Sequence, residues 1–326
     1  MSQPVIGRLA PSPTGALHLG NARSFLLAWL SVRQQGGKML LRIEDIDSPR
    51  VKPWARQTTL DDLQWLGIDW DEGPDTQSGL AVAVDRVPCV QTQRLERYHQ
   101  VLSTLIEDQA VYPCVCSRSE VAQAASAPHE ASMQALEGPI YPGTCRNKRL
   151  VLQAHGDAEK FAWRWKFQPG EVVWQDGIRG TMSASPDQQL GDFVIARGDG
   201  TPAYQLAVVV DDHDMHVTEV VRGDDLICST YRQLAILKHL GWTPPNYYHV
   251  PLIVGPDGRR LAKRHGDTRL SAFRQQGVTS EQLIGYLAWT LNLQERPIPT
   301  RATDLIGRLD WKKLSTVPTV FRGDEF

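Results

Sequence analysis

The sequence predicts an α/β fold in which helices cover both faces of a parallel, doubly wound sheet. A short apolar run at 5–9 leads through a turn-rich loop into a stretch at 19–34 whose apolar residues recur at helical spacing. A second apolar run at 38–43 follows directly and is typical of a strand buried on both faces. Strand, helix and strand in this order are expected of a parallel sheet.

Length and composition are those of an ordinary globular protein. The 326 residues suffice for about two domains, and the chain is 41% hydrophobic and 22% charged. We find no signal peptide at its start and no run long enough to span a membrane, so we expect a cytoplasmic protein. We also expect a monomer. The net charge of −2 means that a nucleic acid would have to bind local basic patches.

The loop between the first strand and helix is the first candidate binding site. A helix start exposes free N–H groups and attracts phosphate, and His18 and Asn21 lie about one turn apart there. The loop matches neither the common phosphate-binding loop nor the dinucleotide fingerprint. A helix cap beside a surface histidine is the simpler alternative.

The remaining elements follow from periodicity and from turn residues. Glu44 follows the second strand, at the sheet edge where doubly wound folds bind ligands, and Arg222 follows a buried strand at 218–221. The acidic run at 211–216 is interpreted as a polar helix end, since sequential residues cannot all reach one ion. Further helices are predicted at 54–65, 93–109, 119–136, 226–240, 270–275, 280–293 and 303–313, strands at 148–152, 161–167 and 249–254, and a hairpin at 191–201.

The cysteines indicate a metal site and argue against a disulfide framework. Their number is odd, at five, and three of them lie close together in the sequence. Cys114 and Cys116 are followed after 24 residues by Tyr141 and then by Cys145. Three thiolates and one further donor suit tetrahedral Zn²⁺, with Tyr141, His129 or water as the fourth ligand. Buried cysteines without metal are the alternative.

Two motifs carry a family resemblance. Residues 8–15 followed by His18-Leu19-Gly20-Asn21 resemble the HIGH region of class I aminoacyl-tRNA synthetases, in particular their glutamyl/glutaminyl branch. Residues 260–264 resemble the second class I motif, with Lys263 retained but Arg260 and Ala262 replacing the usual lysine and serine. The segments around Glu44, the cysteines and Tyr204 also resemble this branch.

The resemblance implies a site for each substrate. His18 and Lys263 would be catalytic, and Cys114, Cys116, Tyr141 and Cys145 would hold one structural Zn²⁺. ATP, bound with Mg²⁺, would contact His18, Gly20, Asn21, Lys263 and Arg264. Glutamate would contact Arg8, Leu9, Ala10, Pro11, Ser12, Glu44, Tyr204 and Arg222.

The resemblance also implies a class I domain plan. A Rossmann-type catalytic domain would comprise 1–109 and 191–243, interrupted by a zinc-containing insertion at 110–190 and followed by a helical subdomain at 244–326. The anticodon-binding region of glutamyl-tRNA synthetases is missing, which resembles the glutamyl-queuosine tRNA(Asp) synthetases. These enzymes transfer activated glutamate to queuosine in the anticodon stem-loop of tRNA(Asp). The alternatives are a truncated enzyme that charges tRNA(Glu) and a non-catalytic paralogue.

Overall fold

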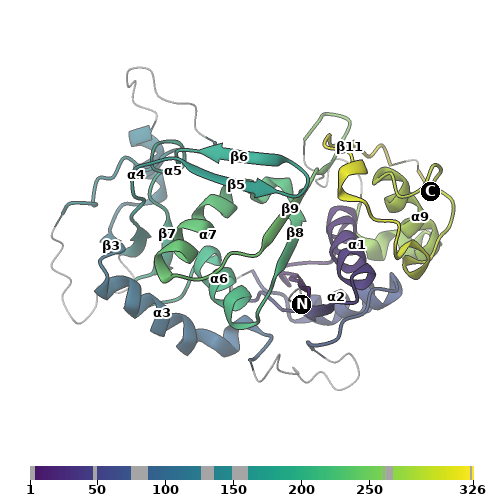
Figure 1. Ribbon diagram of the computed structural model, residues 1–326, viewed down its shortest axis with the longest axis horizontal. Helices are drawn as coiled ribbons and strands as arrows, with labels where there is room; N and C mark the ends of the chain where they lie inside the picture. The colour runs from purple at the N-terminus through teal and green to yellow at the C-terminus, as the bar shows by residue number, and fades with distance from the viewer. Residues whose placement is uncertain are drawn as a thin grey trace.

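A six-stranded sheet runs through the middle of the molecule (Figure 1). The computed structural model describes residues 4–46, 50–74, 87–125, 136–148, 161–259, 261, 267–323 and 325–326. The strands of the sheet, in spatial order, are β2 (Lys38–Leu41), β1 (Ile6–Leu9), β8 (Glu219–Gly223), β9 (Asn246–Val250), β5 (Val172–Asp176) and β6 (Gly180–Ala184).

The predicted α/β class with a parallel sheet is confirmed. The strands from β2 to β5 pair in parallel with their neighbours, and only β6 is antiparallel, as the second strand of a hairpin with β5. The β5–β6 hairpin was not predicted. The helix α1 (Leu19–Gln34) has the predicted bounds and connects β1 with β2.

Hydrophobic cores lie on both faces of the sheet. Met39 and Leu41 belong to the core that contains α1, whereas Leu40 points to the opposite core. This alternation follows from the two-residue period of a strand. The second core contains side chains of α3 (Leu95–Glu107), α6 (Tyr204–Asp214) and α7 (Ile227–Leu240). The sheet is therefore covered on both sides, as a doubly wound fold requires.

A smaller antiparallel sheet lies beyond α3. It consists of β3 (Val111–Cys114), β4 (Ala162–Trp165) and β7 (Val194–Arg197), in that order. The helix α4 (Arg118–Ala125) begins just after β3. The predicted domain boundary at 190 stays a prediction: β5 and β6, which precede it, belong to the large sheet, whereas β7, which follows it, belongs to the small one.

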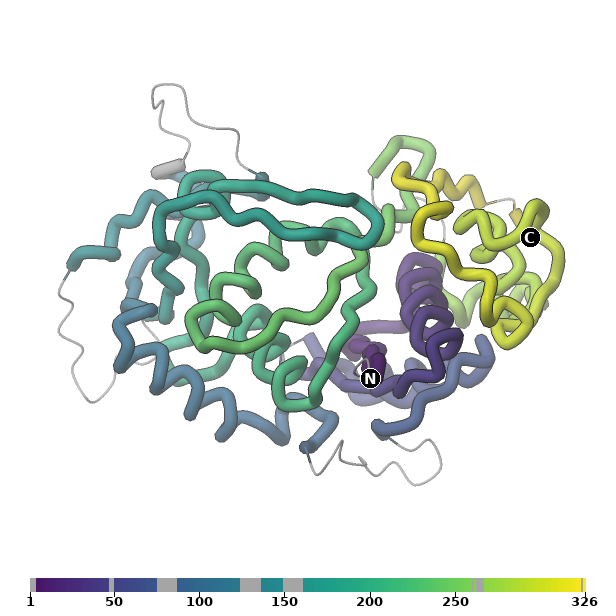
Figure 2. The backbone as a smooth tube through the Cα atoms, viewed as in Figure 1, coloured from purple at the N-terminus to yellow at the C-terminus, as the bar shows by residue number. Residues whose placement is uncertain are grey.

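The C-terminal segment packs beside α1, as Figure 2 shows by the purple and yellow parts of the tube. Its helices are α8 (Leu270–Gln275) and α9 (Ser280–Thr290), and β11 (Thr319–Val320) pairs with β10 (Ile253–Val254). The predicted helix at 303–313 is wrong. Gly307, with φ +85°, separates two short 3-10 turns, Ala302–Leu305 and Trp311–Lys313.

Other predictions are confirmed with shifted ends. The helix α2 spans Pro53–Trp65, and a 3-10 turn at Gln91–Arg94 precedes α3. A further 3-10 turn at Asp224–Leu226 leads into α7. The short helix α5 (Pro186–Gln189), which follows β6, was not predicted. The predicted strand at 249–254 is split into β9 and β10 at Pro251, which has no N–H to donate. Most of the predicted strand at 148–152 and the end of the helix predicted at 119–136 lie outside the described residues.

Candidate active site

The order of the large sheet creates one topological switch point, between β1 and β8. From β1 the chain proceeds to β2 on one side, and from β8 it proceeds to β9 on the other. In doubly wound folds, ligands bind at the carboxyl ends of the strands at such a point. Arg8 lies near the end of β1 and Arg222 near the end of β8, so two predicted glutamate-binding residues meet there.

Arg8 is buried, with 5% of its surface exposed. Its Nη1 donates to the carbonyl oxygen of Val221 at 3.2 Å, and its Nε lies 3.9 Å from Oδ1 of Asp212. Burial lowers the pKa of Arg8, and the Asp212 carboxylate opposes this shift. The Nε atom has no hydrogen-bond partner among the described residues. One donor of a buried cation is therefore left for another group.

Arg222 is held by side chains from two elements. Its Nη2 donates to Oγ1 of Thr230 at 2.8 Å and to Oε1 of Gln233 at 2.9 Å, both on α7. Its Nε lies 3.1 Å from Nε2 of His249 on β9, and its Nη1 has no hydrogen-bond partner in the described part of the chain. Tyr204, at the start of α6, is 38% exposed and interacts electrostatically with this guanidinium.

Glu44 is fixed by Arg42, which is fully buried. Nη2 of Arg42 lies 3.1 Å from Oε1 of Glu44, and Nη1 lies 2.7 Å from Oδ1 of Asp212. The Nε atom of Arg42 lies 3.5 Å from the Asp211 carboxylate. Burial raises the pKa of Glu44, while Arg42 and Arg8 oppose this shift. The acidic end of α6 thus forms buried ion pairs with arginines, and Arg94 adds a further cation at Asp211.

The loop after β1 runs alongside the end of β2. The Arg42 amide donates to the carbonyl of Leu9 at 2.9 Å, and the Glu44 amide donates to that of Pro11 at 3.0 Å. The Leu9 side chain belongs to the core. Ala10 is half-buried and Ser12 is exposed, so these two lie nearer the surface. The predicted segment 9–12 is therefore placed beside Glu44.

The start of α1 is capped by its own residues. Oδ1 of Asn21 accepts the His18 amide at 3.2 Å, so this oxygen serves the helix cap. The His18 side chain is exposed. A Cβ atom at Gly20 would lie 3.2 Å from the His18 ring, so glycine leaves room for that ring.

The segment that follows the second motif lies beside the start of α1. Lys263 and Arg264 lie outside the described residues, as do Arg260 and Ala262. On the far side of this loop, Thr268 accepts the Leu19 amide at 3.0 Å, and the Leu270 amide donates to Leu17 at 2.9 Å. The chain that leaves the second motif is therefore hydrogen-bonded beside His18.

The structure brings the predicted metal ligands together. The sulfur atoms of Cys114, Cys116 and Cys145 lie within 4.8 Å of one another, and those of Cys116 and Cys145 are 3.6 Å apart. Tetrahedral Zn²⁺ with thiolate ligands requires sulfur separations of about 3.8 Å. The Tyr141 hydroxyl lies 3.3 Å from the sulfur of Cys114 and accepts the Cys145 amide. The donor set fits a zinc ion, and His129 lies outside the described residues.

Cys114 and Cys145 are buried, and Cys116 is half-buried. Burial raises the pKa of the Cys116 thiol to about 11 and also raises that of the Tyr141 phenol. A dication at the centre would favour the thiolates over the thiols, since metal binding releases protons from its ligands. The Arg164 guanidinium lies 3.9 Å from the centre of the Tyr141 ring and fixes that ring from the side of β4.

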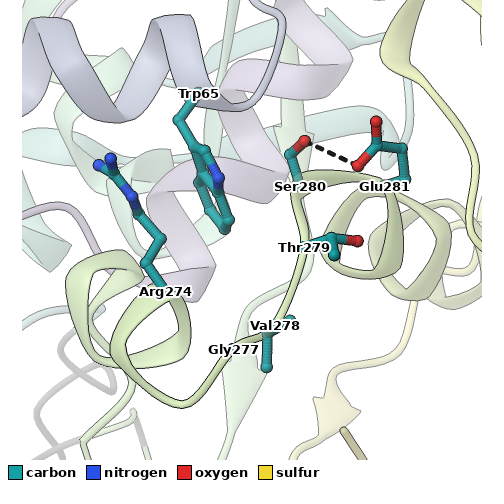
Figure 3. A pocket seen from close by; sticks show the side chains of 7 residues that line it. All are labelled: Trp65, Arg274, Gly277, Val278, Thr279, Ser280 and Glu281. Carbon is teal, nitrogen blue, oxygen red and sulfur yellow. Dashed lines mark hydrogen bonds between the residues drawn. The ribbon is translucent and has the colours of Figure 1, made fainter.

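A surface hollow of about 360 Å³ lies away from these residues (Figure 3). Trp65 lines it from the end of α2, with the Arg274 guanidinium 5.3 Å from the ring centre. Ser280 and Glu281, joined by a 3.1 Å hydrogen bond, line it from the start of α9. It contains none of the predicted site residues, so the charged groups at the switch point remain the candidate active site.

Sequence reasoning missed the buried residues that position the predicted site residues. The motif around Glu44 predicts a role for Glu44 alone, although it contains Arg42, and the strand predicted at 249–254 carries no predicted role for His249. Asp176 belongs to the unpredicted hairpin, and its Oδ2 lies 2.7 Å from Nδ1 of His249. A charged residue inside an otherwise apolar strand was the available signal for Arg42.

Comparison with known proteins identifies the family. Residues 4–299 match the family described as class I tRNA synthetases (E and Q), catalytic domain. The chain belongs to the class I tRNA synthetases. These synthetases are ligases that use ATP.

Relatives of two kinds are similar to this synthetase. Glutamyl-Q tRNA(Asp) synthetases from Rhodopirellula baltica and Nitratidesulfovibrio vulgaris are 46% and 45% identical, over 98% of this chain and 97% and 96% of theirs. Glutamate–tRNA ligase 2 from Syntrophus aciditrophicus is 42% identical over 86% of this chain and 56% of its own. A glutamate tRNA ligase from Elizabethkingia meningosepticum, crystallised with its amino acid, superimposes with a TM-score of 0.80 at 26% identity, over 99% of this chain and 68% of that one.

No helix within the described parts of this synthetase has both the length and the apolar composition that a membrane crossing requires.

Proposed function

We propose that this synthetase activates L-glutamate with ATP and transfers it to queuosine at the wobble position of tRNA(Asp). The observation that carries the choice of amino acid is the pair of buried guanidinium groups at the switch point. Arg8 and Arg222 each retain one donor nitrogen without a hydrogen-bond partner among the described residues. Unpaired donors of buried cations favour binding of an anion.

The pocket would recognise both ends of glutamate. Arg222 and Arg8 would bind the side-chain carboxylate, because guanidinium matches a carboxylate in a forked geometry. The Tyr204 ring would line the pocket, and the Glu44 carboxylate would accept the α-ammonium group. Glutamine lacks the side-chain charge, and its amide would place N–H donors against N–H donors. It should therefore be a poor substrate.

Formation of the adenylate needs no covalent enzyme intermediate. An α-carboxylate oxygen of glutamate attacks the α-phosphorus of ATP, the bond to the β-phosphate oxygen breaks, and pyrophosphate leaves. His18 and the start of α1, with Gly20 and Asn21, would hold the phosphates, and Lys263 and Arg264 would neutralise charge on the leaving group. Bound Mg²⁺ would screen the phosphate charge. Such catalysis depends on positioning and charge.

The acceptor is the second part of the proposal. A queuosine hydroxyl would attack the activated carbonyl carbon, and AMP would leave. This part is supported by relatives named glutamyl-Q tRNA(Asp) synthetase, three of which align over 94–97% of their own length. Relatives named glutamate–tRNA ligase align over only 56–63% of theirs. Charging of tRNA(Glu) is the alternative.

The cysteine cluster completes the proposal. Cys114, Cys116 and Cys145 would hold one Zn²⁺, with the Tyr141 hydroxyl as the fourth donor. The ion would join β3 to the loop that contains Tyr141 and Cys145, so its contribution would be structural. None of the groups proposed for catalysis belongs to this cluster.

Pyrophosphate exchange into ATP tests the activation step. We expect exchange with glutamate in the absence of tRNA, since the groups proposed for this step belong to the synthetase itself. Comparable exchange with glutamine would overturn the assignment of the pocket. Absence of exchange with either amino acid would favour a non-catalytic paralogue.

A further inference from the structure

A chain of three buried polar side chains leads from the β5–β6 hairpin to the proposed glutamate pocket. Asp176 ends β5, His249 lies on β9, and Arg222 lies on β8, so the chain crosses three neighbouring strands. Oδ2 of Asp176 is 2.7 Å from Nδ1 of His249, and Nε2 of His249 is 3.1 Å from Nε of Arg222. Both His249 and Asp176 have fully buried side chains.

The hydrogen bonds determine where the His249 proton resides. The Nε atom of Arg222 can only donate, so Nε2 of His249 must accept and cannot carry a proton. The single proton of the neutral ring is then on Nδ1, from which it is donated to Asp176. A protonated ring would place a second donor and a second positive charge against Arg222. His249 is thus neutral in one defined tautomer.

Asp176 and His249, the first two side chains of this hydrogen-bonded series, are fixed by further contacts. Oδ1 of Asp176 accepts the amides of Ile178 and Arg179 at 2.9 and 2.8 Å, which holds the carboxylate in the hairpin turn. The His249 ring packs against two aromatic neighbours, with its centre 5.6 Å from that of Trp174 and 6.2 Å from that of Tyr247. The ring therefore has little freedom to rotate.

The fixed ring determines which donors Arg222 offers to a ligand. With Nε bound to His249 and Nη2 bound to α7, only Nη1 remains unpaired among the described residues. We propose that Asp176 and His249 are positioning residues for amino-acid selection, which orient Arg222 so that Nη1 faces the substrate carboxylate. This inference rests on the proposed function, because it deepens the role of the glutamate pocket.

Two substitutions of His249 separate positioning from packing. The amide nitrogen of asparagine lies near the position of Nδ1, so His249→Asn keeps a donor to Asp176 and loses the acceptor for Arg222. The amide oxygen of glutamine lies near the position of Nε2, so His249→Gln keeps that acceptor. Both variants lose the same contacts with Trp174 and Tyr247. A role in packing alone would affect them equally.

The expected readout is a selective change in the KM for glutamate during pyrophosphate exchange. His249→Asn should raise it about tenfold or more, the effect of losing a hydrogen bond to a charged group. His249→Gln should raise it by about threefold or less, and the KM for ATP should stay within about twofold in both variants. Equal effects of the two variants, or no effect of His249→Asn, would overturn the inference.

The tautomer gives a second test that uses the unmodified protein. Nitrogen-15 chemical shifts distinguish Nδ1–H from Nε2–H imidazole, and His249 can be assigned among the nine histidines through the bonds that connect its ring to its own backbone. We expect Nδ1–H at pH 7. A ring protonated at Nε2 would overturn the inference, even if neither variant folds.

The two tests distinguish this inference from the function on which it rests. If the unmodified synthetase fails to exchange pyrophosphate with glutamate, the proposed function falls, and the role of Arg222 falls with it. If it is active but the two His249 variants behave alike, only the positioning role is overturned.

Discussion

At the residue scale, the candidate site is a set of buried charges whose partners nearly all come from the chain itself. Burying an ion is costly unless it is paired, so each unpaired donor is an informative exception. Arg42 has three carboxylates around it, whereas Arg8 and Arg222 each keep one free donor nitrogen among the described residues. At the switch point, this contrast separates Arg42, which is structural, from Arg8 and Arg222, which suit a ligand.

Removing the Arg222 side chain should selectively weaken the binding of glutamate. Arg222→Ala should raise the free energy of glutamate binding by about 2–5 kcal/mol, the scale for loss of one partner of a buried charge pair. Arg222→Lys should also bind glutamate weakly, because lysine keeps the charge but lacks the forked pair of donors of a guanidinium group. The KM for glutamate in pyrophosphate exchange measures both effects. Arg197→Ala, an exposed arginine on β7, is the control. A normal KM for Arg222→Ala would contradict the pocket.

Removing the Arg42 side chain should destabilise the fold. Arg42→Ala leaves Glu44, Asp211 and Asp212 without their shared cation, which should cost about 3–5 kcal/mol in the free energy of unfolding. Urea denaturation measures this loss. The matched control is Arg33→Ala, whose partners Asp69 and Asp71 are 73% and 41% exposed. That change should cost about 1 kcal/mol or less. Equal losses in the two variants would contradict the account.

At the element scale, local signals predicted most helices and the first strands. The bounds of α1 and α8 agree with those predicted, and Gly241, with φ +68°, ends α7 as expected of a C-terminal glycine. The β5–β6 hairpin was missed because it joins the sheet through the pairing of β5 with β9, a contact distant in sequence. For the same reason, the Asp176–His249–Arg222 chain could not be predicted from local patterns.

The elements that carry the cysteine cluster should depend on the proposed zinc ion. Elemental analysis should find one zinc ion per chain, and Cys116→Ser should lose it and become more sensitive to protease between β3 and β4, since structural zinc contributes folding energy. The rate of pyrophosphate exchange with glutamate should fall by a smaller factor than the resistance to protease. Cys228→Ser is the control, because Cys228 lies outside the cluster. Metal-free protein with unchanged protease resistance would refute the structural role.

At the scale of the whole molecule, stability should depend on pH through His249. Burial lowers the pKa of His249 from 6.5 to about 4, with Asp176 opposing this shift. Between these values the unfolded chain binds the proton and the folded protein does not. The contribution of the neutral His249 ring to the free energy of unfolding is therefore complete above pH 6.5 and is lost as the pH falls towards 4.

This loss should amount to about 3 kcal/mol of unfolding free energy. Denaturation of the unmodified protein and of His249→Gln at pH 7, 5.5 and 4 isolates the effect, because glutamine does not titrate. The difference in stability between the two proteins should shrink as the pH falls. A constant difference would contradict a neutral, buried His249.

The central claim is that glutamate is activated in this core and transferred to a base of the anticodon loop. The most direct measurement is incorporation of labelled glutamate into tRNA(Asp), with and without queuosine, before and after removal of the 3′-terminal adenosine. The account predicts incorporation that requires ATP and queuosine and survives removal of the adenosine. Incorporation that is lost on trimming, or that occurs equally well without queuosine, would contradict it and favour charging of the acceptor end.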